Sequence, residues 1–249
     1  MLNRIMIIIA FFAVGVSDAS DMSRYDVSKA WDKAVVYVPN QFFTKTVETV
    51  EVEKPMPVVV FLHGCGGIHD HERRWAEEIK AAGYIVVLPN SFGIPGREVN
   101  CISETSTPNI GKVPVNDLRP AEAEYAASKV KEMKWADKDN IFLMGHSEGG
   151  MGAYLTKELG FKGIIVSGFP CSVRRRVGSE HGTPFLAINW ERDPYFENTN
   201  YPYAQCSDRP FWKTRIDTNQ LVLPGKGHAT AYERSAREAV LKFIKDRVN

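Results

Sequence analysis

The feature that most restricts the fold of this chain is a five-residue motif, Gly145-His146-Ser147-Glu148-Gly149. It follows the apolar run 141–144 and precedes a helix-like segment that extends to Leu159. In a strand–turn–helix of this kind the serine sits on a sharp, strained turn. The residues two before and two after it must lack side chains so that strand and helix can approach each other. The turn also places the serine hydroxyl at a helix N-terminus. The motif therefore predicts that Ser147 is a nucleophile held above the edge of a sheet.

Apolar runs typical of strands alternate with helix-like segments along the rest of the chain. The run PVVVFL at 57–62 is typical of a strand that is buried on both faces. We expect further strands at 35–38, 46–52, 84–89, 163–167, 183–190 and 218–223, and further helices at 72–82, 120–135 and 232–248. This alternation predicts an α/β fold around a mostly parallel sheet. No repeat or linker interrupts it, so we expect residues 20–249 to form a single domain.

The first nineteen residues have the pattern of a secretory signal peptide. One early charge, Arg4, precedes an apolar run over 5–16, and this run is shorter than the roughly 20 residues needed to span a bilayer. Small residues at Ser17 and Ala19 suit cleavage after Ala19. We therefore expect a secreted or periplasmic protein with no stable membrane insertion after cleavage. An uncleaved membrane anchor and a buried N-terminal helix are the alternatives.

The charge balance argues against a nucleic-acid partner, and the cysteine content predicts disulfides. The chain has 31 basic and 30 acidic residues, so no global field attracts nucleic acid, and we expect no nucleic-acid partner. It has four cysteines, Cys65, Cys101, Cys171 and Cys206, an even number in a chain expected to be exported, which predicts two disulfides. Their spacing contains no CxxC pair of the kind found in zinc sites.

A second glycine-rich motif, His63-Gly64-Cys65-Gly66-Gly67, directly follows the strand at 57–62. Such a turn lets backbone N–H groups face a substrate, and one of them pairs with the N–H that follows the nucleophile to bind an oxyanion. We expect these two donors to be the N–H groups of Cys65 and Glu148, with Gly66 as the alternative to Cys65. Cys65 as the nucleophile is the competing interpretation. We expect His63 to be structural and to bond the loop backbone.

Two histidines follow Ser147 and could act as its base. His181 precedes the strand at 183–190 and so belongs to the wrong edge of a parallel sheet, whereas His228 follows the strand at 218–223. In α/β proteins that carry the nucleophile on a strand–turn–helix of this kind, the order along the chain is serine, then acid, then histidine. We therefore expect His228 to be the general base.

The acid is expected after the preceding strand. Asp193 lies three residues past Trp190, and Pro194 restricts the backbone directly after it, so Asp193 is the expected acid. Glu191 is the nearest alternative, followed by Asp208 and Asp217.

One further cluster looks like a set of metal ligands, His69-Asp70-His71-Glu72. These residues fall at an expected helix start, where acidic side chains interact favourably with the helix dipole. We therefore expect no metal and no organic cofactor.

Together these motifs resemble one protein family. The sets at 63–67, 88–93, 145–150 and 227–228 resemble the dienelactone hydrolase branch of the α/β-hydrolase superfamily, and most of all its exported members with paired cysteines. The resemblance implies an α/β-hydrolase fold, with a mostly parallel central sheet and helices on both faces. It also implies the disulfide pairing Cys65–Cys101 and Cys171–Cys206. The best-known members use a cysteine nucleophile, so Ser147 favours ordinary esters as substrates over dienelactone.

The function expected from these features is secreted serine ester hydrolysis through a Ser147–His228–Asp193 triad and an acyl-enzyme. The substrate is expected to be a small-molecule or polymer-linked ester. A serine peptidase of the same fold and a non-catalytic binding protein are the alternatives. The aromatic stretch 195–212 is open to two interpretations, a pocket wall or packing of a long loop.

Overall fold

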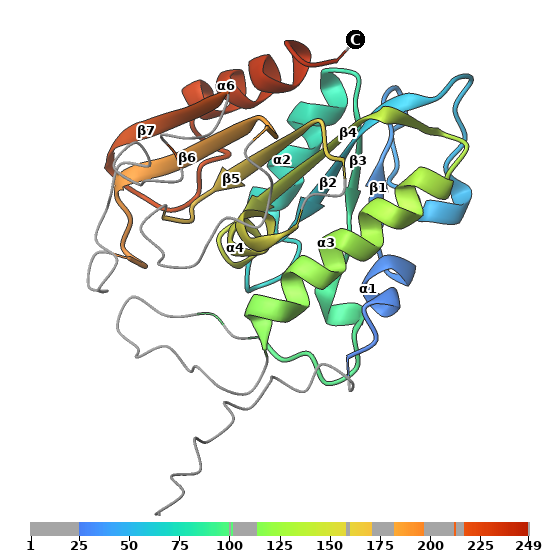
Figure 1. The fold of residues 1–249 in the computed structure, drawn as a ribbon, viewed down its shortest axis with the longest axis horizontal. Coiled ribbons are helices and arrows are strands. Elements are labelled where there is room, and N and C mark those ends of the chain that lie inside the picture. The colour runs from blue at the N-terminus through green and yellow to red at the C-terminus, as the bar shows by residue number, and fades with distance from the viewer. Residues whose placement is uncertain are drawn as a thin grey trace, which may run out of the picture.

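The computed structural model describes residues 25–99, 101, 114–157, 160–170, 182–196, 212 and 217–248 (Figure 1). Several expectations from the sequence fall outside these residues. They are the signal peptide at 1–19, the pairing of Cys171 with Cys206, and the placement of His181 and Asp208.

A seven-stranded sheet forms the centre of the molecule, with the order β1-β3-β2-β4-β5-β6-β7. The strands are β1 (Val35–Tyr37), β2 (Met56–Leu62), β3 (Ile85–Leu88), β4 (Ala136–His146), β5 (Gly163–Ser167), β6 (Phe185–Arg192) and β7 (Thr218–Lys226). The edge strand β1 is antiparallel to β3, and every other neighbouring pair is parallel. The predicted mostly parallel sheet is therefore confirmed, and the carboxyl ends of six strands meet at one edge.

Helices cover both faces of this sheet (Figure 1). Helices α2 (Asp70–Ala81) and α6 (Arg234–Lys245) lie on one face, and α1 (Ser28–Asp32), α3 (Val115–Glu132) and α4 (Glu148–Leu155) lie on the other. Among the described residues, no helix is both long and apolar enough to cross a membrane.

The continuous apolar run in β2 reflects burial on both faces, as predicted. Val58, Val60 and Leu62 belong to the core on the α3 side, whereas Val59 and Phe61 belong to the core on the α2 side. All five side chains are fully buried. Successive residues of a strand point to opposite faces, so a strand between two helical layers needs an apolar side chain at every position.

Several sequence-based expectations about elements were wrong. The expected strand at 46–52 is a short 3₁₀ helix, η2 (Val47–Thr49), because the side chains of Thr46 and Thr49 form a reciprocal capping box that closes a turn. Helix α3 begins at Val115, and Pro120 lies inside it and not at its first position. Helix α4 ends at Leu155, four residues earlier than expected.

Candidate active site

The turn between β4 and α4 holds Ser147 in a strained backbone conformation, with φ 55° and ψ −117°. A Cβ atom on Gly145 would lie 2.0 Å from the carbonyl oxygen of Gly149, and one on Gly149 would lie 2.1 Å from that of Leu62. No side chain fits at either position. This confirms the steric reason for both glycines of the motif, because β4, α4 and β2 approach here backbone to backbone.

The structure brings His228 and Asp193 together beside this turn. Nδ1 of His228 lies 2.7 Å from Oδ2 of Asp193, and both side chains are largely buried. The second carboxylate oxygen of Asp193 accepts a hydrogen bond from the N–H of Tyr195. The ring of His228 lies 4.8 Å from the ring of His146, the residue that precedes Ser147. The three residues expected to form a triad therefore follow the carboxyl ends of β4, β6 and β7, at the same edge of the sheet, with β5 lying between β4 and β6.

The alternative acids that the structure describes lie elsewhere. Glu191 is exposed, and its carboxylate accepts a hydrogen bond from the N–H of Gly225 at 3.0 Å. Asp217 precedes β7, at the opposite edge of the sheet, and pairs with Arg247. Of these three acids, Asp193 is the one in contact with His228.

The glycine-rich turn after β2 lies directly against the turn that holds Ser147. A Cβ atom on Gly64 would lie 3.6 Å from Cβ of Ser147. The turn closes with a hydrogen bond from the N–H of Gly67 to the carbonyl of Gly64, at 3.1 Å. Glu148 is the first residue of α4, and the first N–H groups of a helix have no partner within that helix. The two expected oxyanion donors, Cys65 and Glu148, therefore belong to two turns that face each other. We call residues 63–67 the oxyanion turn below.

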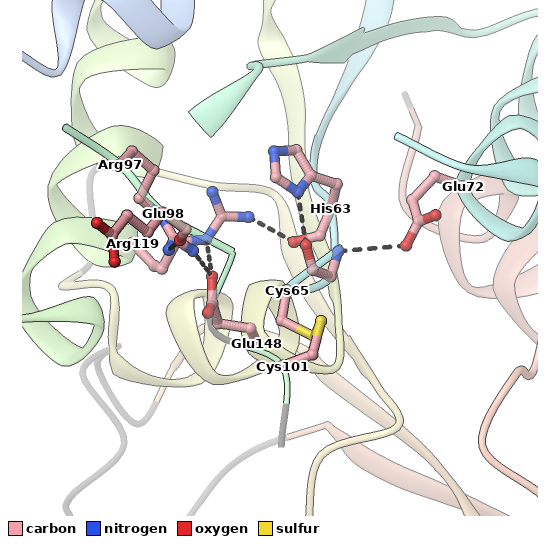
Figure 2. Close-up of a disulfide and its surroundings, with 9 residues drawn as sticks. His63, Cys65, Glu72, Arg97, Glu98, Cys101, Arg119 and Glu148 are labelled. Carbon is pink, nitrogen blue, oxygen red and sulfur yellow. Dashed lines mark hydrogen bonds and ion pairs between the residues drawn. A yellow bond between two sulfur atoms is a disulfide. The ribbon is translucent and has the colours of Figure 1, made fainter. Parts of the chain in front are cut away.

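Cys65 forms a disulfide with Cys101, with a Cα–Cα separation of 5.0 Å (Figure 2). This is the first of the two pairings that the family resemblance implied. It excludes Cys65 as a nucleophile, because the sulfur is already bonded. It also ties the oxyanion turn to the segment that follows β3.

Sequence reasoning missed a buried cluster of charges behind the oxyanion turn. We call Arg97, Arg119, Glu122 and Glu148 the arginine–glutamate cluster (Figure 2 draws three of them). Arg97 lies 2.5 Å from the Glu148 carboxylate, and Arg119 lies 3.5 Å from the same oxygen. Arg119 also pairs with Glu122, three residues further along α3. Both arginine side chains are fully buried. The one available signal was the placement of Arg119 and Glu122 on a face of α3 that is otherwise apolar.

His63 is structural, as predicted, and its hydrogen bonds define its tautomer. Nε2 accepts a hydrogen bond from the N–H of Ser91 at 3.0 Å, so the proton of the neutral ring is on Nδ1, which donates to the carbonyl of Gly64 at 2.7 Å. Burial, together with the nearby charge of Arg119, lowers the pKa of His63 to about 3. The ring is therefore neutral near pH 7.

A second polar cluster lies near the carboxyl end of β4, on the α2 side of the sheet. His71, Glu72 and His146 have ligand-type atoms within 4.8 Å of one another, although the expected ligand-like set was His69 to Glu72. Nε2 of His71 accepts a hydrogen bond from the N–H of Ala231, which leaves the proton on Nδ1. A metal-bound histidine normally donates a hydrogen bond through its second nitrogen, whereas Nε2 of His71 accepts one. This bond therefore favours a proton on Nδ1 over a metal at that atom. Burial, with the nearby rings of His71 and His228, lowers the pKa of His146 well below its usual value.

Aromatic side chains lie around the His228 ring. The ring centroid of Tyr195 is 4.4 Å away and that of Phe196 is 6.2 Å away. Phe196 also packs edge-on against Phe169. The start of the aromatic stretch therefore combines contact with the site and packing, while residues 197–211 lie outside the described part of the chain.

Comparison with known proteins agrees with this architecture. A sequence model of the dienelactone hydrolase family matches residues 44–245. No curated protein sequence matches the chain.

Solved structures share the fold at low sequence identity. A candidate dienelactone hydrolase from Klebsiella pneumoniae subsp. pneumoniae aligns with a TM-score of 0.62 and 15% identity, over 85% of this chain and 92% of that one. Est1E from Butyrivibrio proteoclasticus aligns with a TM-score of 0.56 and 14% identity, over 86% and 93%. A glucuronoyl esterase from Solibacter usitatus aligns with a TM-score of 0.58 and 14% identity, over 87% and 77%. These likenesses establish the α/β-hydrolase fold, as predicted.

Proposed function

The chain belongs to the dienelactone hydrolase family, and on that premise we propose that it is an exported serine hydrolase that cleaves carboxylic ester bonds. Family membership and the fold support a hydrolase that cleaves esters. One observation carries the finer proposal. Ser147 lies on the strained turn between β4 and α4, and the hydrogen-bonded pair of His228 and Asp193 lies beside that turn.

The proposed mechanism is two-step acyl transfer. His228 accepts the proton of the Ser147 hydroxyl as the oxygen attacks the carbonyl carbon of the ester. His228 then donates that proton to the leaving alkoxide, which leaves an acyl group on Ser147. Water repeats the sequence and releases the acid. Asp193 accepts a hydrogen bond from Nδ1 of His228, so Nε2 is left to exchange the proton, and the carboxylate stabilises the imidazolium that forms.

The oxyanion of each tetrahedral intermediate would be bound by the N–H groups of Cys65 and Glu148. The carboxylate of Glu148 is held by Arg97, in the buried cluster behind the turn. Such a preformed donor is typically worth about 2.7–4 kcal/mol in the transition state. This mechanism requires neither a metal nor an organic cofactor.

The proposed substrate is a small-molecule or polymer-linked ester, and the proposed location is outside the cytoplasm. Disulfides persist in oxidising compartments, so the Cys65–Cys101 bond supports export. Tyr195 and Phe196 supply aromatic surface beside His228. An aromatic acyl group is therefore included in the substrate series below.

The test is hydrolysis of p-nitrophenyl esters, from acetate to decanoate together with a cinnamate, by the protein and its Ser147→Ala variant. We expect the substitution to lower kcat by several orders of magnitude. Ser128→Ala is the matched control, because Ser128 is an exposed serine on α3, and it should retain full activity. Activity that survives in Ser147→Ala would overturn the mechanism.

A further inference from the structure

One peptide unit of the oxyanion turn, between His63 and Gly64, is held at both ends by buried charged side chains (Figure 2). Its carbonyl oxygen accepts a hydrogen bond from Nη2 of Arg119 at 2.5 Å. Its N–H donates to Oε1 of Glu72 at 3.2 Å. Because a peptide unit is planar, two such anchors on opposite sides fix its orientation. The next peptide unit carries the N–H of Cys65. Its carbonyl accepts hydrogen bonds from Nδ1 of His63 at 2.7 Å and from the N–H of Gly67 at 3.1 Å, so its direction depends on these bonds together with the orientation of the unit before it.

The position of Glu72 is unusual for a residue that caps a helix. It is the third residue of α2, and its Oε2 accepts a hydrogen bond from the N–H of His69, which completes a capping box. Its other oxygen bonds Gly64, eight residues earlier and in a different structural element. The residue is only 4% exposed. Burial raises the pKa of the Glu72 carboxyl, but the neighbouring His71 and the N–H of Gly64 outweigh burial and leave the pKa below its usual value.

The same end of α2 also holds the loop that carries the catalytic histidine. His71 accepts a hydrogen bond from the N–H of Ala231 at 3.1 Å. One turn later, Nε1 of Trp75 donates to Oγ1 of Thr230 at 3.4 Å. Both partners lie within three residues of His228. Adjacent residues of α2 therefore contact the two halves of the site, the oxyanion turn and the histidine loop.

We propose that Glu72 is a positioning residue, which fixes the oxyanion turn relative to the histidine loop so that the N–H of Cys65 points at the developing oxyanion. This inference rests on the proposed function. Without the Glu72 anchor the peptide unit keeps its bond to Arg119 but loses the partner of its N–H, so it can tilt about that remaining bond and the donor that follows it loses part of its alignment. Removing one oxyanion donor typically lowers kcat about 10²–10³-fold, so a misaligned donor should lower kcat about 10–100-fold.

Glu72→Gln and Asp70→Asn are the matched pair of variants that test this. Both remove one negative charge from the first turn of α2, but Asp70 is exposed, and no described contact joins it to the oxyanion turn. Two quantities are measured: the kinetic constants for the best ester of the series, and hydrogen exchange in a peptide covering residues 63–68. Glu72→Asp is included because it keeps the charge with a shorter reach, in case the glutamine variant does not fold.

We expect kcat to fall 10–100-fold in Glu72→Gln with KM within about twofold, because an oxyanion donor acts mainly in the transition state. Exchange over 63–68 should be faster, and Asp70→Asn should match the wild type in both measurements. An equal loss of kcat in Asp70→Asn would overturn the proposal, since the cause would then be the charge of the helix end. Faster exchange with unchanged kcat would also overturn it.

Failure of the proposed function would give a different result. A wild-type protein that neither hydrolyses the esters nor reacts with a fluorophosphonate at Ser147 would overturn the function. In that case the exchange measurement still decides whether Glu72 holds the turn. Unchanged exchange in Glu72→Gln would remove the basis of the positioning role.

Discussion

Replacing Arg119 with methionine tests whether the arginine–glutamate cluster is held together by that one guanidinium. Arg119 is fully buried, and it pairs with Glu122 and donates to the carbonyl of His63. Methionine fills part of the same space but leaves the carboxylate of Glu122 buried without its cation. Breaking a buried ion pair by removing one partner costs about 3–5 kcal/mol. In a domain of this size each kcal/mol changes Tm by roughly 2–4 °C, so Tm should fall by about 6–20 °C.

Two further variants separate this effect from a general loss of charge. Lys129 and Glu132 form a pair with the same spacing on the same helix, but both are partly exposed. Lys129→Met should therefore cost no more than about 1 kcal/mol. The double variant Arg119→Met with Glu122→Leu removes the orphaned carboxylate and should recover most of the lost stability, because apolar replacements of buried ion pairs are often neutral.

The pH dependence of the Arg119→Met effect has a definite sign. Burial raises the pKa of Glu122 above its ordinary value of 4.5, and the charge of Arg119 opposes that rise. Without Arg119 the pKa in the folded state rises further. When folding raises the pKa of a carboxyl, the folded state binds that proton more tightly than the unfolded chain does. The resulting contribution to stability is fully present at a pH below the pKa of the unfolded chain, and it is lost as the pH rises through the pKa of the folded state. The variant should therefore be less destabilised at pH 5 than at pH 8.

Urea unfolding followed by circular dichroism at the two pH values measures these differences for all four proteins. The reasoning would be refuted if Arg119→Met cost less than about 1 kcal/mol at pH 8. It would also be refuted if the double variant were as unstable as the single one.

Two other predictions concern the oxyanion turn. Cys101→Ser removes a disulfide between residues 36 positions apart, which should lower the free energy of unfolding by up to ~4 kcal/mol. A reductant should lower the Tm of the wild type at least as much as the substitution does. A Tm that responds to neither change would contradict this prediction. Because folding lowers the pKa of His63 from 6.5 to about 3, the unfolded chain binds the extra proton first, and the resulting loss of stability begins as pH falls below 6.5. Between pH 6.5 and 5, proton binding to His63 in the unfolded chain should lower the free energy of unfolding by about 2 kcal/mol. The free energy of unfolding of His63→Asn, measured in urea, should therefore fall less over that range than that of the wild type. An equally steep fall in both proteins would count against a neutral, buried His63.

The parts of the fold and site that could be predicted are those defined by local sequence. The Gly-x-Ser-x-Gly motif predicted the turn at Ser147, because the close approach of backbones excludes side chains at both glycines. The apolar run in β2 predicted burial on both faces. The segment at 46–52 was misread because its alternating residues fit a strand equally well, and the capping pair of Thr46 and Thr49 decided the outcome.

The contacts that join distant segments could not be predicted. Arg97, Arg119 and Glu148 come from three separate segments, a loop, α3 and α4, which meet only in the folded chain, and no local pattern relates them. Glu72 was read as a helix-start residue, which it is, but its second hydrogen bond crosses to the oxyanion turn. The local sequence around Glu72 indicates its bond within the helix start but not its bond to a distant segment.

The location of the arginine–glutamate cluster favours a role in positioning the oxyanion turn over a role in stabilising the fold. Buried ion pairs are weak evidence for stability, since well-packed apolar residues of similar volume often do as well. This cluster lies behind the peptide that leads to Cys65, and Arg119 bonds that peptide directly. If the cluster serves position and not stability, the double variant Arg119→Met with Glu122→Leu should fold nearly as well as the wild type and still lose kcat, with KM little changed. If the double variant recovered stability and kept full kcat, the cluster would have no positioning role, and the orientation of the oxyanion turn would have to depend on His63, Glu72 and the disulfide alone.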